Sequence, residues 1–159
     1  MPPALLFDLT QIDLNCEPLF DKDAICQVNP QRFEMQQLDG ILWCDKARAC
    51  ILGYKDVTDH EFWVRGHIPG RPLMPGVMQI EAAAQLLSFF VTRIYEERGF
   101  IGFGGIEHAK FRAPIEPGCR LYLLGHVTEA RAGRKYACDV QGVVSQALVF
   151  EATISGMKV

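Results

Sequence analysis

Two residues near the middle of the chain, His67 and Glu81, have side chains that can act as general acids or bases. An imidazole can remove a carbon-bound proton near neutral pH. A carboxyl group that stays protonated can deliver its proton to a departing hydroxyl. Each residue also has a plainer interpretation, because loop histidines are usually solvated and a glutamate at the edge of an apolar stripe can reach water. Spacing alone leaves both interpretations open.

The residues between this pair favour the chemical interpretation. Prolines at 69, 72 and 75 indicate a stiff, extended path after His67. Gly76 then puts a residue without a side chain at an expected helix start, where free N–H groups and the positive end of the helix dipole can bind a carbonyl oxygen or an oxyanion. A base, an acid and an oxyanion site together suit elimination of water from a 3-hydroxyacyl thioester.

A helix must position Glu81, and apolar periodicity predicts one from Gly76 to about Arg98, with Gly99 as its stop. Glu81 lies inside the apolar stripe, where a bare carboxylate would be costly to bury. Gln85 follows one helical turn later on the same face and could hold Glu81, although a core-packing role is equally compatible with its position. The stripe consists of Val77, Ile80, Ala84, Leu87, Val91 and Ile94.

Strand-like runs surround this helix in the sequence. Short turns join the later runs, which favours an antiparallel sheet and an α+β fold. We expect residues 1–28 to form an N-terminal extension and residues 29–159 to form the main domain. The predicted strands are residues 41–45, 49–54, 104–111, 120–129, 135–143 and 148–155.

Composition restricts the functional classes. The chain has 159 residues and a net charge of −3, so no basic excess calls for nucleic acid or anionic lipid. No apolar run approaches the roughly 20 residues that span a bilayer, and the N-terminus does not resemble a signal peptide. Six cysteines lack C-x-x-C spacing, which predicts reduced thiols, no metal site and a cytoplasmic protein.

The central segment resembles the signature of the 3-hydroxyacyl-acyl-carrier-protein dehydratases. Its core is GHIPGRPLMPGVMQIEAAAQ at residues 66–85, and the similarity extends over roughly residues 29–155. Flanking matches are NPQRF at 29–33, YKDVT at 54–58, AKFRAP at 109–114 and PG at 117–118. Two positions depart from the family pattern: Ile68 replaces a usual phenylalanine, and Gln31 replaces a usual histidine.

The resemblance implies the hotdog fold, an antiparallel sheet wrapped around one long central helix. It implies that His67 is the catalytic histidine and Glu81 the catalytic carboxylate. Gly76 and Val77 would bind the thioester carbonyl, and Gln85 would orient Glu81. No metal or organic cofactor is expected, because phosphopantetheine on an acyl carrier protein delivers the substrate. Active sites in the family form between two subunits, which implies a homodimer. Three such dimers could assemble further into a trimer of dimers.

Two other functions compete with dehydration: a hotdog thioesterase and a non-catalytic acyl-binding protein. Two aromatic residues after the helix, Phe100 and Phe103, could cap an acyl tunnel or pack in the core. An acidic carrier protein would need basic residues for docking, although each could equally be an ordinary solvated side chain. The candidates are Arg65, Arg71, Lys110, Arg112 and Arg120.

Overall fold

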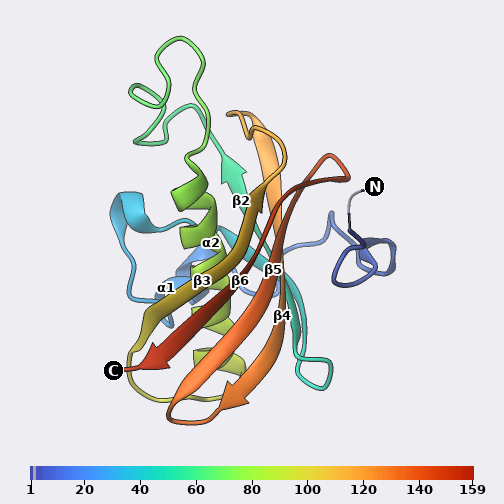
Figure 1. Ribbon diagram of the computed structural model, residues 1–159, viewed down its shortest axis with the longest axis vertical. Helices are drawn as coiled ribbons and strands as arrows, with labels where there is room; N and C mark the ends of the chain where they lie inside the picture. Colours follow the sequence, from blue (N-terminus) through green and yellow to red (C-terminus); the bar gives the residue numbers. More distant parts are fainter. Residues whose placement is uncertain (2) are drawn as a thin grey trace.

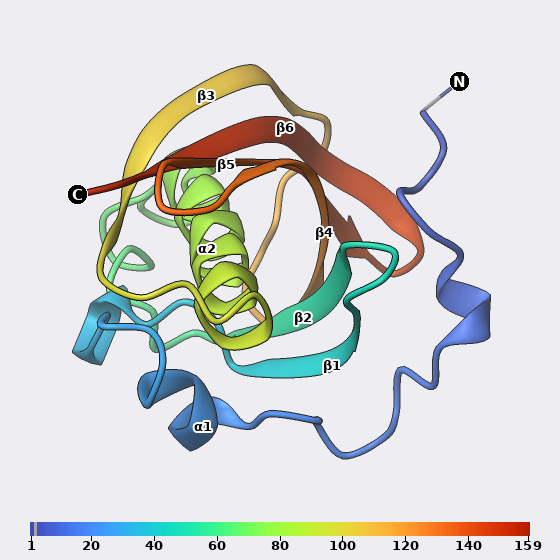
Figure 2. The same ribbon diagram turned by 90° about the horizontal axis from the view of Figure 1, so that it is seen from below.

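A strongly curved antiparallel sheet surrounds a single long helix, α2 (Gly76–Phe89), in the computed structural model, which describes residues 1 and 3–159. The sheet has six strands in the order β1-β2-β4-β5-β6-β3. Figures 1 and 2 show the helix lying in the concave face of this sheet. The predicted α+β hotdog architecture is confirmed. The strands are β1 (Gly40–Asp45), β2 (Cys50–Val57), β3 (Ile101–Phe111), β4 (Cys119–Arg131), β5 (Lys135–Val144) and β6 (Ala147–Lys158).

Alternation along the strands separates two apolar layers. In β5, Tyr136, Cys138 and Val140 are buried while the residues between them are partly exposed, as expected for side chains that point to opposite faces. The layer facing α2 is the larger one. Ala82 and Ala83 of α2 are fully buried in it, and their small side chains allow the sheet to approach the helix closely.

The outer face of the sheet is covered by the N-terminal segment, which Figure 2 shows running around the outside of the sheet. Phe7 is buried there, with its ring centroid 5.0 Å from that of Trp43. Gln141 fixes the segment through its amide, which accepts from Leu6 N at 2.8 Å and donates to the Ala4 carbonyl at 3.0 Å. The short helix α1 (Lys22–Cys26) follows. The proposed division at residue 28 stays a prediction.

The predicted end of the long helix is wrong. After α2 the chain forms a π-helical turn at Phe90–Ile94 and then leaves the helix before Arg98. Glu97 is held elsewhere: its carboxylate accepts from Gly133 N at 2.7 Å, from the Tyr136 hydroxyl, and from Lys158 Nζ at 3.1 Å. These bonds to the β4–β5 turn and to β6 outweigh continued helix propensity. No described helix is long and apolar enough to cross a membrane.

Candidate active site

The loop between β2 and α2 carries His67 and projects beyond the sheet (Figure 1). Its base is fixed by an ion pair between Lys55 and Glu61 at 2.8 Å, with both side chains almost buried. Thr58 Oγ1 donates to the same Glu61 carboxylate at 3.0 Å. A buried pair with a further hydrogen bond is costly to break, so the loop begins from a rigid support.

His67 is exposed, but its backbone and ring are both held. His67 N donates to Trp63 O at 2.7 Å, and Leu73 N donates to His67 O at 2.8 Å. The peptide bond between His67 and Ile68 is cis. The ring atom Nδ1 lies 2.8 Å from the Leu73 carbonyl oxygen. Since a carbonyl only accepts, Nδ1 carries the proton in the neutral ring, and Nε2 is left free to accept one.

The start of α2 offers unpaired amide groups. Met78 N and Gln79 N both donate to Pro75 O, whereas the N–H groups of Gly76 and Val77 have no acceptor in the described part of the chain. These two groups lie at the positive end of the helix dipole. Val77 is 76 % exposed, so the helix start is open to solvent, and the placement of Val77 in the apolar stripe that faces the core is wrong.

Phe111 explains why residue 76 is glycine. A Cβ atom added to Gly76 would lie 2.8 Å from Cζ of the Phe111 ring, closer than real Cβ contacts allow. The ring itself is half exposed at the end of β3. Sequence analysis missed this residue, because nothing in the pattern of β3 indicates that its last side chain packs against the start of α2.

Glu81 is held in place on the next turn of the helix. Gln85 Nε2 donates to Glu81 Oε1 at 2.8 Å and to Met35 O at 2.6 Å, and Gln85 Oε1 accepts from Gln37 N at 2.8 Å. The sequence predicts the contact between Gln85 and Glu81 from their spacing. It gives no signal for Met35 and Gln37, which belong to the segment before β1.

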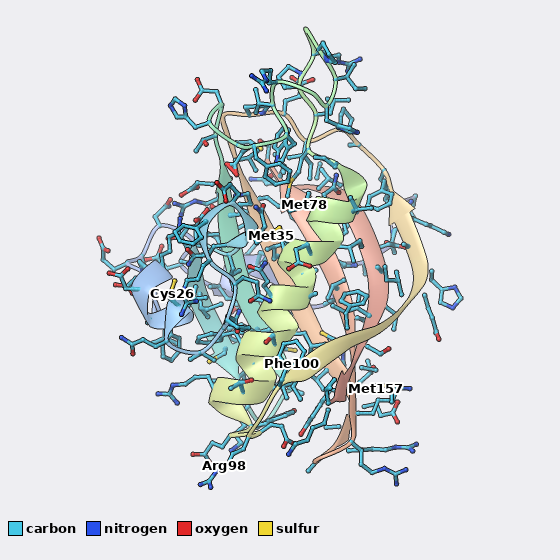
Figure 3. All side chains as sticks on the ribbon, turned by 90° about the vertical axis from the view of Figure 1, so that its left-hand side faces the viewer. Cys26, Met35, Met78, Arg98, Phe100 and Met157 are labelled. Atoms are coloured by element: carbon cyan, nitrogen blue, oxygen red, sulfur yellow. The ribbon has the colours of Figure 1, made fainter. Side chains whose placement is uncertain are left out.

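A cavity of about 150 Å³ opens beside Glu81. Its lining includes Gln31, Gln85, Phe100 and Phe103 as well as part of β6. Figure 3 shows Phe100 where β3 passes α2, at the opposite end of the helix from Met78. Phe100 and Phe103 are each more than half exposed, so packing in the core, one of the two interpretations of these aromatics, is wrong.

His67 and Glu81 make no direct contact with each other in the described chain. Among residues 1 and 3–159, no hydrogen bond or ion pair joins them: the His67 ring contacts Leu73 O, and the Glu81 carboxylate contacts Gln85. The structure thus brings together Glu81, Gln85 and the cavity. His67 is not among the residues that line this cavity, and it lies on the loop that leads to the start of the helix.

Two of the predicted docking cations are already paired with carboxylates. Arg112 Nη2 lies 2.9 Å from Glu151 Oε1. Arg120 makes a two-pronged contact with Asp56, at 2.7 and 3.0 Å, and its guanidinium stacks 3.8 Å above the Tyr54 ring. Much of their positive charge is therefore neutralised by the sheet itself.

The other candidate cations are freer. Arg71 lies 3.8 Å from Glu116, and both side chains are more than half exposed, which makes this a weak pair. Lys110 is exposed on β3 and has no ion pair within the described residues. The positive charges of Arg71 and Lys110 are therefore less neutralised than those of the two paired arginines.

A family model described as a FabA-like domain matches residues 29–153. The chain belongs to the FabA-like family. It is 35 % identical over 143 residues to the 3-hydroxyacyl-[acyl-carrier-protein] dehydratase FabZ of Erythrobacter litoralis, covering 86 % of this chain and 93 % of that protein. A FabZ of Clostridium botulinum is 36 % identical over 116 residues, covering 72 % of this chain and 80 % of that protein.

Solved structures support the fold of this FabA-like protein. The dehydratase heterocomplex ApeI:P from Xenorhabdus doucetiae aligns with a TM-score of 0.70 and 10 % identity, covering 85 % of this chain and 90 % of that chain. At this identity the likeness concerns the fold alone. It agrees with the six-stranded sheet around α2 described above.

Proposed function

We propose that this protein dehydrates 3-hydroxyacyl thioesters, carried on acyl carrier protein, to trans-2-enoyl thioesters in fatty acid biosynthesis. The observation that carries the proposal is membership of the FabA-like family. The chain matches relatives named as dehydratases over most of their length. The geometry agrees with this chemistry. The loop and helix supply a histidine with a free ring nitrogen, an open helix start and a carboxyl group at a cavity.

The proposed reaction uses these three parts in one elimination. The N–H groups of Gly76 and Val77 hold the thioester carbonyl oxygen, which makes the neighbouring carbon more acidic. His67 Nε2 removes the proton from that carbon. Glu81 gives its proton to the 3-hydroxyl, which leaves as water, and Gln85 keeps the carboxyl group aimed through the bond at 2.8 Å. These steps use no metal or organic cofactor. That the reaction needs none stays a prediction.

We propose that each site combines His67 of one subunit with Glu81 of another. Strand β3 supports this arrangement because it ends the sheet order, and its outer edge pairs with no other strand in the described chain. Phe103, Ile106 and Phe111 on β3 are about half exposed. An edge strand with large exposed apolar side chains is suited to pairing with a second copy. Larger assemblies, such as a trimer of dimers, stay a prediction.

The proposed carrier-protein dock centres on Arg71 and Lys110, because the charges of Arg112 and Arg120 are occupied by Glu151 and Asp56. An acidic partner attracted to exposed cations would bind in a salt-dependent way. The predicted cytoplasmic location follows from the cysteine pattern and stays a prediction.

The deciding experiment incubates the purified protein with 3-hydroxybutyryl and crotonyl thioesters of acyl carrier protein and follows the enoyl absorbance. We expect reversible interconversion, and a loss of roughly 10²–10⁴-fold in kcat for His67→Ala and Glu81→Gln. Glu107→Gln, an exposed position on β3, serves as the matched control. Release of free thiol would indicate a thioesterase instead. Binding of acyl chains of several lengths without turnover would indicate an acyl-binding protein.

A further inference from the structure

The N-terminal segment and the outer face of the sheet lie on either side of a cavity of about 910 Å³. Figure 2 shows this segment outside the sheet, on the side away from α2. Tyr122 of β4 and Val143 of β5 form the sheet side of the cavity. Its lining shares no residue with the cavity beside Glu81. Its volume is in the range of sites that bind small organic molecules, roughly 300–1,000 Å³.

The N-terminal segment lines this cavity with apolar side chains. The Phe7 ring is buried beside Trp43, and a 3₁₀ turn at Leu9–Gln11 follows it. The other apolar side chains of the lining on this segment are only half-buried. Apolar surface that the fold leaves in contact with water lowers the free energy when a ligand covers it. These half-buried side chains are Leu5, Leu9, Ile12 and Leu14.

The charged part of the lining is negative only. Asp8 and Asp13 are exposed at the cavity, and no lysine, arginine or histidine lines it. Neither carboxylate has an ion pair within residues 1 and 3–159. Each is held by its own neighbours: Asp8 Oδ1 accepts from Thr10 N at 2.9 Å, and Asp13 Oδ1 accepts from Asn15 N at 2.9 Å. The cavity therefore attracts a cationic group and repels a carboxylate or a phosphate.

We propose that this cavity binds a cationic amphiphile, a molecule with an alkyl chain and an ammonium group. The alkyl chain covers the half-buried apolar side chains of the N-terminal segment, and the ammonium group lies at the carboxylates of Asp8 and Asp13. The same charges disfavour acyl phosphopantetheine, because it carries a phosphate. The ligand thus differs in charge from the substrate of the proposed function, and the inference does not depend on that function.

The test is isothermal titration calorimetry of the full-length protein with three ligands that share a ten-carbon chain: decylammonium, decanol and decanoate. Each ligand is kept below the concentration at which it forms micelles. We expect one decylammonium to bind per chain, about tenfold more tightly than decanol, because the attraction to the two carboxylates adds to the burial of the alkyl chain. Decanoate should bind more weakly than decanol.

The double variant Asp8→Asn with Asp13→Asn tests the role of charge. Asparagine keeps a side-chain oxygen that can accept from the local backbone but removes the negative charge. We expect decylammonium to lose its advantage over decanol, while the affinity for decanol stays unchanged. The control is Glu17→Gln with Asp23→Asn, two exposed residues outside the cavity. It changes the net charge by the same amount and should leave the preference for decylammonium intact.

Leu14→Trp tests the cavity itself. The larger side chain takes up part of the hollow, so decylammonium and decanol should both bind more weakly and by the same factor. Leu19→Trp adds the same ring at an exposed position outside the cavity and is the control. Thermal melting checks that each variant is folded. It should also show a higher Tm for the wild type with decylammonium, because a ligand that binds the folded state stabilises it.

Three results would overturn the inference. They are no binding of decylammonium to the wild type, equal affinities for decylammonium and decanoate, and an unchanged affinity for decylammonium in either test variant. If Leu14→Trp does not fold, the double asparagine variant alone decides. None of these results bears on dehydration, because the enoyl absorbance assay measures that activity separately.

Discussion

The Nδ1 atom of His67 donates to the Leu73 carbonyl, and Glu81 accepts from the Gln85 amide, each at 2.8 Å. Both contacts fix which atom of the proposed catalytic group faces the substrate. The ring keeps Nε2 free to act as a base, and the bond from Gln85 occupies one oxygen of the Glu81 carboxyl group, which lines the cavity. Orientation by a neighbouring hydrogen bond is the usual means by which proteins prepare such groups.

At the residue scale, replacing Gln85 by methionine tests this orientation. The variant keeps the side-chain length but cannot donate to Glu81, so we expect kcat to fall about tenfold while KM changes little. The Gln37 amide also loses its acceptor, at a cost of about 1–3 kcal/mol in the free energy of unfolding. Steady-state kinetics and urea denaturation measure the two effects.

The control is Ser88→Ala, which lines the same cavity but makes no hydrogen bond with Glu81. A methionine variant with the kcat of the wild type would show that Glu81 needs no help from Gln85.

Residue types and helical spacing predicted the contact between Glu81 and Gln85, because residues four apart share a face whatever surrounds the helix. The family resemblance singled out His67. The same reasoning could not find Gln31, Met35 or Gln37 as neighbours of the site, because their placement depends on how the segment before β1 folds against α2. A local sequence pattern cannot predict such a contact between distant parts of the chain.

At the scale of elements, the ion pair between Lys55 and Glu61 joins the end of β2 to the loop that carries His67. Lys55→Met should leave the Glu61 carboxylate without its cation and lower the free energy of unfolding by about 3–5 kcal/mol. We also expect a lower kcat, because the loop loses its support. Urea denaturation and hydrogen exchange over residues 58–74 provide the measurements.

The double variant Lys55→Met with Glu61→Met removes both charges and should recover most of the lost stability, because two apolar side chains need no compensation. Equal stability of the single and double variants would contradict a role for the pair.

Glu97, which follows α2, makes the stability of the protein depend on pH. Hydrogen bonds from Tyr136, Gly133 and Lys158 lower the Glu97 pKa from 4.5 to about 2. A carboxyl with a depressed pKa in the folded state stabilises the protein above its unfolded pKa. That contribution is lost as pH falls from about 4.5 through about 2. Glu97→Gln should therefore be less stable than wild type at neutral pH, with a difference that shrinks across this window.

Thermal or urea denaturation at a series of pH values measures this difference, with Glu96→Gln, an exposed neighbour, as control. A difference that stays constant down to pH 2 would contradict the assignment. Burial and the bond to Glu97 raise the Tyr136 pKa to about 12, so its share of stability is present below the usual value of 10 and is lost as pH rises through about 12.

Strands were predicted more accurately than the end of the helix, for a physical reason. The alternation in β5 arises because one face of the strand packs against the core, so the residues of the strand alone are enough to reveal it. The helix end was placed at Arg98 because Gly99 is a common stop signal. The actual end depends on Glu97 reaching the β4–β5 turn and Lys158, a contact between parts of the chain far apart in sequence.

At the scale of the whole molecule, the lack of a direct contact between His67 and Glu81 makes subunit exchange informative. In a two-fold dimer with shared sites, mixing His67→Ala and Glu81→Ala subunits should restore about half of the sites in each mixed dimer, although either variant alone is inactive. Activity is measured after co-refolding equal amounts of the two. If no activity returns although mixed dimers are demonstrated by tagged pull-down, both residues act within one subunit.

The N-terminal segment affects how the protein can be handled. Residues 4–14 cover an apolar outer sheet surface that includes Leu42, Leu52 and Leu124. A recombinant fragment trimmed to the family boundaries at 29–153 would leave this surface bare and invite precipitation. Domain boundaries taken from sequence similarity would thus omit the segment that covers this apolar surface.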